Sequence, residues 1–90
     1  MKSRPLTSAQ IRAARALLRW SAEDLARASA LGITTIRRAE LTEDETSLTA
    51  ANDLAVRRTL EAAGVEFIDE NGGGPGVRLR QRQRPKTPKK

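Results

Sequence analysis

Apolar residues recur at helical spacing through the first two thirds of the chain. The repeat predicts four helices, which cover residues 8–19, 22–29, 33–41 and 49–63. Thr7 opens a Thr-x-x-Gln sequence that ends at Gln10, and this capping-box pattern is typical of a helix start. Ser21 is a second N-cap candidate, and Gly64 follows the fourth helix where glycine commonly ends helices. This part of the chain is therefore predicted to be helical.

The pattern changes after the fourth predicted helix. Residues 65–68 and 77–80 alternate between apolar and polar side chains, and glycine-rich residues 69–76 separate them. This order predicts two strands joined by a turn. The glycines do not make a phosphate-binding loop, because that motif needs Gly-Lys-Ser/Thr leading into a helix. The sequence thus predicts a mainly α fold of four to five helices, with a short C-terminal β-hairpin packed on them.

Composition excludes several kinds of chemistry. The chain has 90 residues, enough for one small domain, and contains neither histidine nor cysteine. Zinc fingers, disulfide frameworks, thiol nucleophiles and the Ser-His-Asp triad are excluded, so we expect no enzyme, no metal and no cofactor. No apolar run approaches the roughly 18 residues of a membrane span, and no signal peptide begins the sequence. We therefore expect a cytoplasmic protein with no membrane partner.

The formal charge of +6 is unevenly distributed along the chain. Residues 6–76 hold eight basic and eleven acidic residues, for a net charge of −3, and the basic excess belongs to the two ends. Residues 81–90 are polar, basic or proline, and are predicted to be disordered. Such a tail either solubilises the protein or binds phosphates without reading sequence. The arginines available for such contacts near this end are Arg78, Arg80, Arg82 and Arg84.

A tight break at residues 30–32 separates the second and third predicted helices. Short helices with such a break fit the helix-turn-helix, whose third helix enters the major groove of DNA. The chain resembles the Cro/phage-repressor (XRE) helix-turn-helix family, and in particular its small stand-alone bacterial regulators. The stretches that carry the resemblance are residues 21–27 (SAEDLAR), 35–40 (TIRRAE), 60–71 (LEAAGVEFIDEN) and 77–79 (VRL). It implies a transcriptional regulator that binds double-stranded DNA.

The resemblance also implies a division of the chain and roles for single residues. The parts are a flexible N-terminus (1–6), the helix-turn-helix domain (7–64), the hairpin (65–80) and the basic tail (81–90). Arg15 and Glu40 match a structural salt bridge of the family. The residues matched to contacts with bases or phosphates are Ser21, Ile33, Thr34, Arg37 and Arg38. An arginine at such a position can bridge O6 and N7 of guanine.

Five features depart from the family pattern. Ala22 replaces a glutamine that would contact DNA, and apolar Ile33 stands where a polar reader is common. Gly32 replaces the N-cap serine of the third helix. Ala30 replaces the turn glycine, and either adopts a positive φ at some cost or reshapes the turn. The loop Glu43-Asp44-Glu45 carries negative charge where relatives carry basic residues, and this charge opposes docking on phosphates.

Two functional hypotheses follow. The first is a sequence-specific regulator that binds an inverted repeat as a homodimer, formed through the hairpin or the fourth helix, since a two-stranded sheet leaves open edges. The second is a helix-turn-helix fold used as a protein-binding module, such as an antiactivator or antitoxin. In the second hypothesis the acidic face binds a basic partner by electrostatic complementarity.

Overall fold

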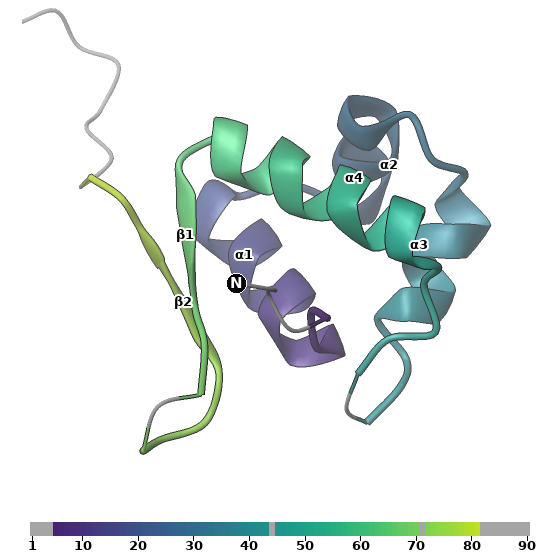
Figure 1. Ribbon diagram of the computed structural model, residues 1–90. Helices are drawn as coiled ribbons and strands as arrows, with labels where there is room; N and C mark the ends of the chain where they lie inside the picture. Colours follow the sequence, from purple (N-terminus) through teal and green to yellow (C-terminus); the bar gives the residue numbers. More distant parts are fainter. Residues whose placement is uncertain (1–4, 44, 71, 82–90) are drawn as a thin grey trace, which may run out of the picture.

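The computed structural model describes residues 5–43, 45–70 and 72–81, and these form four helices followed by a two-stranded hairpin (Figure 1). The elements are α1 (Ser8–Leu18), α2 (Ala22–Ser29), α3 (Ile33–Ala39), α4 (Ala50–Ala62), β1 (Val65–Ile68) and β2 (Gly76–Leu79). The predicted mainly α fold with a C-terminal hairpin is confirmed at this level. None of the described helices has the length and apolar character needed to cross a membrane.

The helix starts lie where local capping chemistry predicts them. The Thr7 side chain accepts a hydrogen bond from the Gln10 N–H, and the Gln10 side chain accepts one from the Thr7 N–H at 3.0 Å. Ser21 forms the same reciprocal box at the start of α2, and Thr49 caps α4. The ends of α1 and α3 come one and two residues earlier than predicted, because Arg19 turns into the left-handed region and Glu40 caps α3.

The core lies between the four helices and the inner face of the hairpin. Its largest fully buried apolar residues are Leu6, Ile11, Leu25, Ile36, Val56, Leu60 and Val65. Each helix thus contributes a stripe of apolar residues, which is how amphipathic helices are stabilised by tertiary packing. Trp20, between α1 and α2, packs half-buried against this core.

The prediction that residues 1–6 form a flexible N-terminus is wrong at Leu6, which is fully buried. Its N–H donates to Asp53 Oδ1 at 3.0 Å, and its carbonyl accepts from the Thr46 N–H at 3.2 Å. Thr7 forms a β-bridge with Glu45 beside it. The chain before α1 is therefore fixed to the loop before α4 by contacts that local sequence does not reveal. Residues 1–4 lie outside the described residues.

The hairpin packs on α1 and α4 through alternate residues. Val65 pairs with Leu79 and Phe67 with Val77, and these four side chains pack in or against the core. Gln10 Nε2 of α1 donates to the Gly76 carbonyl at 3.0 Å. The second strand starts at Gly76, one residue before its predicted start. The hairpin therefore closes the side of the core that lies away from α3 (Figure 1).

The turn between α2 and α3 contains a strained residue. Ala30 adopts φ 62° and ψ 28°, so the first of the two expected alternatives, a positive φ, is confirmed. This left-handed conformation costs an L-residue roughly 1–2 kcal/mol. Gly32 begins α3 with extended geometry and no side-chain cap. The connection between the two helices is therefore short but held at a conformational cost.

Replacing Ala30 with glycine is expected to stabilise the protein. The exposed Ala30→Gly variant removes the steric cost of the left-handed backbone, partly offset by a more flexible unfolded chain, for a net gain of about 0.5–1 kcal/mol. Urea denaturation measures the free energy of unfolding. The matched control is Ala28→Gly, an exposed position within α2, where the same change is expected to cost about 1 kcal/mol. A destabilised Ala30→Gly variant would contradict the assignment of strain.

Candidate functional site

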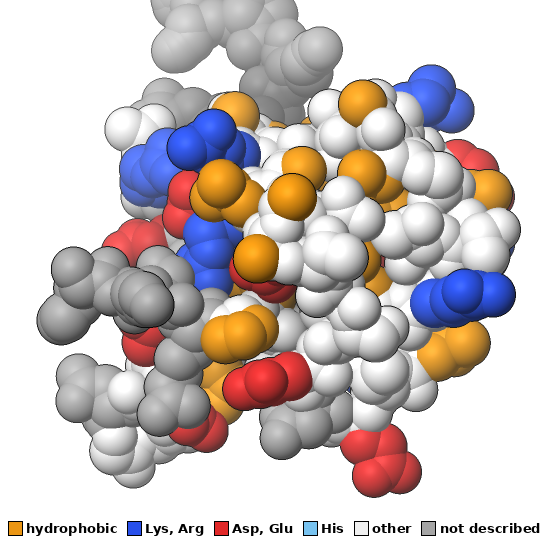
Figure 2. All heavy atoms as spheres, turned by 45° about the vertical axis from the view of Figure 1, so that its right-hand side comes forward, with side chains coloured by type: hydrophobic (Ala, Val, Ile, Leu, Met, Phe, Trp, Pro, Cys, Tyr) orange, Lys and Arg blue, Asp and Glu red, His pale blue; other side chains and the backbone are white. Residues whose placement is uncertain are grey.

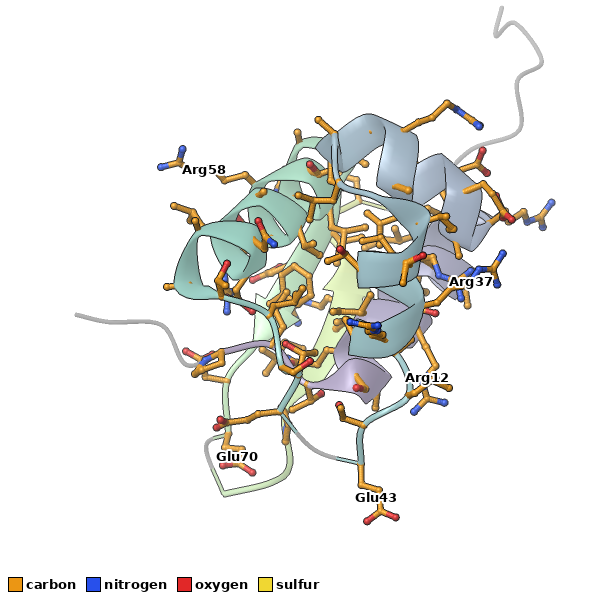
Figure 3. All side chains as sticks on the ribbon, turned by 90° about the vertical axis from the view of Figure 1, so that its right-hand side faces the viewer. Arg12, Arg37, Glu43, Arg58 and Glu70 are labelled. Atoms are coloured by element: carbon orange, nitrogen blue, oxygen red, sulfur yellow. The ribbon has the colours of Figure 1, made fainter. Side chains whose placement is uncertain are left out.

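The candidate site is the outward face of α3. Ile36 and Ala39 point into the core, which leaves Thr34, Arg37 and Arg38 exposed. Ile33 is half-buried and packs against the core, so only part of its side chain reaches the surface. Figure 3 shows Arg37 projecting on the same side as Arg12 of α1, while Arg58 of α4 projects on the opposite side. The structure thus brings the four residues predicted on this helix to one short surface.

The two arginines of α3 have different surroundings. Arg37 Nη2 lies 2.6 Å from Glu23 Oε2 of α2, and both side chains are more than half exposed. Among the described residues, the Arg38 guanidinium forms no hydrogen bond or ion pair. Arg37 is therefore ion-paired with a carboxylate of its own chain, whereas the donors of the Arg38 guanidinium are available to an external acceptor.

The start of α2 carries negative charge at the predicted phosphate cap. Ser21 Oγ accepts from the Asp24 N–H at 3.0 Å, and the Ser21 N–H donates to Asp24 Oδ2 at 2.8 Å. This backbone hydrogen bond is the main cause that lowers the pKa of Asp24 below its ordinary value, so the carboxylate is ionised at neutral pH. Asp24 Oδ1 also lies 2.6 Å from Arg27 Nη2, and the neighbouring Glu23 is paired with Arg37. The two carboxylates beside the Ser21 hydroxyl are therefore each compensated by an arginine, and these pairs offer a phosphate no net positive charge.

Arg15 and Glu40 are brought together across α1 and the end of α3. Two hydrogen bonds join them, from Nε to Oε2 at 2.7 Å and from Nη2 to Oε1 at 2.8 Å. Arg15 Nη1 also donates to the Trp20 carbonyl at 2.9 Å. The side chains are only 21% and 9% exposed, and the bond to Glu40 is the main cause that raises the Arg15 pKa. This bidentate pair fixes the C-terminal end of α3 against α1.

A polar hollow of about 140 Å³ lies beside α3 and was missed at the level of sequence. Its lining comes from α3, the loop before α4 and the first turn of α4: Thr35, Arg38, Ser47, Leu48, Thr49 and Asn52. None of the lining residues that the structure describes is a carboxylate. The hydroxyl residues Thr46, Ser47 and Thr49 were the available signal, but only the fold places this segment against Arg38.

The predicted arginines of the hairpin do not join the α3 surface. Arg78 Nε lies 3.0 Å from Glu66 Oε1 on the neighbouring strand, and Arg80 Nη2 donates to the Glu61 carbonyl at 3.1 Å. The hairpin lies on one side of the molecule and α3 on the other, with α1 and α4 between them (Figure 1). Arg82 and Arg84 lie outside the described residues. The predicted contact residues therefore divide into two separate surfaces.

Acidic residues gather at one end of the molecule. Glu45, Asp69 and Glu70 line a hollow of about 80 Å³ together with Pro5, Thr7, Gln10 and Pro75. Figure 3 shows Glu43 and Glu70 projecting at this same end. On the face in Figure 2, carboxylates lie at the lower end, where no basic side chain of the described residues is seen. Asp44 lies outside the described residues.

No protein-family model matches the chain, and a search of the curated proteins finds no significant match.

Loss of the Arg15–Glu40 pair is expected to destabilise the protein strongly. Glu40→Gln leaves the little-exposed Arg15 guanidinium without its counter-charge, which is expected to cost about 3 kcal/mol in the free energy of unfolding. Glu66→Gln is the matched control, because it makes the same change in the exposed pair with Arg78 and is expected to cost far less. Urea denaturation of both variants measures the difference. Equal losses would show that burial does not distinguish the two pairs.

Proposed function

We propose that the chain is a DNA-binding transcriptional regulator of the XRE helix-turn-helix type, with α3 as the helix that enters the major groove. The observation that carries the proposal is the outward face of α3, where Thr34 and two arginines stand on a helix held to α1 by the Arg15–Glu40 pair. The short connection at residues 30–32 places α2 directly before this helix, as in a helix-turn-helix.

Within this proposal the residues of α3 take different tasks. Thr34 and Ile33 begin the helix, where side chains meet base edges, and both carry methyl groups that suit the thymine methyl. Arg37 is paired with Glu23 through Nη2, and this carboxylate reduces the attraction of the guanidinium for a phosphate or a base edge. Ser21 stands beside Asp24 and adds little attraction for phosphate. Sequence preference is therefore expected to depend chiefly on the first turn of α3.

A homodimer on an inverted repeat is part of the proposal. Pairing two β2 edges would set Arg78 and Arg80 against arginines of the second copy, and like charges across strands are destabilising. The exposed side of α4 instead offers Leu54, which is 43% exposed, next to exposed Ala51 and Arg58. These features favour α4 over the hairpin as the contact between copies.

DNA binding is expected to retain its sequence preference without the basic tail. A chain that ends at Gln81 is compared with the full chain on DNA selected from a random pool and on a scrambled duplex, at several salt concentrations. Truncation lowers affinity for both duplexes, because the tail contacts only phosphates. Thr34→Ala is expected to cost about 1–3 kcal/mol at one base position, since it removes a base contact.

The matched control for that experiment is Arg78→Gln. Arg78 lies in β2, on the other side of the molecule from α3 (Figure 1), and is paired with Glu66, so its loss is expected to leave the sequence preference unchanged. If only the tail binds, and binds all sequences equally, the proposal is wrong.

A second candidate function is a protein-binding module for a basic partner. It is favoured by one observation, the meeting of Glu45, Asp69 and Glu70 around one hollow. Such a surface attracts basic segments through long-range electrostatics.

Neutralising the loop before α4 separates the two functions. Changing Glu43 and Glu45 to Gln and Asp44 to Asn removes charge near the α3 surface, and is expected to tighten DNA binding roughly three- to tenfold at low salt. The control, Asp69→Asn with Glu70→Gln, removes acid at the hairpin turn and is expected to leave DNA affinity unchanged. Electrophoretic mobility shifts measure both. Unchanged DNA affinity in the loop variant would show that the loop does not border the backbone, and would favour the second function.

A further inference from the structure

The hollow beside α3 has the chemistry of an anion site. Its volume of about 140 Å³ is far larger than the roughly 10–15 Å³ that one water requires, so a tetrahedral anion fits. Every lining residue except Leu48 carries a hydrogen-bond donor, and Arg38 adds a positive charge. The lining residues that the structure describes include no carboxylate, so they bring no negative charge to the hollow.

The lining is held in place by contacts beneath it. Leu48 packs against the core, and its N–H donates to Thr46 Oγ1 at 3.3 Å. Thr49 Oγ1 accepts from the Asn52 N–H at 3.1 Å, which leaves the hydroxyl hydrogen free to donate elsewhere. The loop backbone at Leu48 and the Thr49 hydroxyl are therefore fixed before any ligand arrives, and this order lowers the entropic cost of binding.

Arg38 connects the hollow to the outward face of α3. It stands four residues after Thr34, so the two side chains share one face of the helix. Its guanidinium has no partner among the described residues and presents a planar fork of donors, which suits two phosphate oxygens at once. A phosphate in the hollow therefore lies next to bases that Thr34 reads.

We propose that this hollow binds one phosphate group of the DNA backbone, with Arg38 as its charged ligand and the side chains of Ser47, Thr49 and Asn52 as further donors. The inference that the phosphate belongs to DNA rests on the proposed function, whereas the inference that the hollow binds an anion does not. Arg38 becomes a phosphate ligand and leaves base reading to Thr34 and Ile33. A phosphate contact of this kind offsets part of the repulsion from Glu43 and Glu45.

The anion site is tested first without DNA. Inorganic phosphate is titrated into the full chain at constant ionic strength while amide shifts are followed by NMR. Saturable changes are expected at residues 35–38 and 47–52. Asn52→Asp adds a carboxylate to the lining, and is expected to weaken phosphate binding at least tenfold. Ala50→Asp is the matched control, since it adds the same charge at an exposed position in the same turn of α4 outside the lining, and is expected to change binding less than threefold.

Equal effects of the two substitutions, or shifts without saturation, would overturn the anion site. Because both variants place an acid in the first turn of a helix, where it is tolerated, loss of folding is not expected in either.

Whether the phosphate belongs to DNA is tested by measuring the affinity of the Arg38→Gln variant for the selected and the scrambled duplex. A phosphate contact predicts the same fold-loss on both, and a slope of log affinity against log salt that is smaller by about 1. A loss confined to one base position would assign Arg38 to base reading and overturn the phosphate role, while leaving the proposed function intact. Saturable phosphate binding in a chain that shows no DNA preference would support the anion site and reject the proposed function.

Discussion

The ion pair between Arg15 and Glu40 is the interaction on which the α3 surface depends. A helix as short as α3, Ile33–Ala39, is not stable by itself and takes its position from its neighbours. Ile36 and Ala39 fix its inner side by packing, and the Ser8 hydroxyl of α1 donates to the Ala39 carbonyl. The two hydrogen bonds from Arg15 to Glu40, together with the one to the Trp20 carbonyl, add a charged connection at the C-terminal end of the helix. Loss of the pair would therefore weaken the attachment of α3 to α1, and with it the position of the exposed side chains of α3.

The distribution of charge matters more than its sum. The positive total of the sequence belongs mostly to its ends, whereas in the described part of the chain Arg37 and Arg27 are paired with Glu23 and Asp24 of α2. Arg38 has no such partner among the described residues and lines the polar hollow beside α3. A polyanion at this helix therefore meets uncompensated positive charge at Arg38, which favours a contact at that position.

Features that depend on adjacent residues could be predicted from the sequence, and those that depend on packing could not. The caps at Thr7 and Ser21 require groups only three residues apart, so the pattern alone located both helix starts. The positive φ of Ala30 was one of two alternatives that its place in a short turn left open, and the structure decides between them. Leu6 was misassigned because its partners, Asp53 and Thr46, lie some forty residues away. The polar hollow was missed for the same reason, since it forms between three segments that only the fold brings together.

Arg37 and Arg38 show how this limit affects the site. They are adjacent and chemically identical, so the sequence assigned them one task. A helix turns about 100° per residue, which directs one side chain toward Glu23 of α2 and the other toward the hollow before α4. The first arginine has a charged partner within its own chain, and any external anion must compete with that carboxylate. The second has no such competitor among the described residues, so anion binding at this surface is expected to depend on Arg38 far more than on its neighbour.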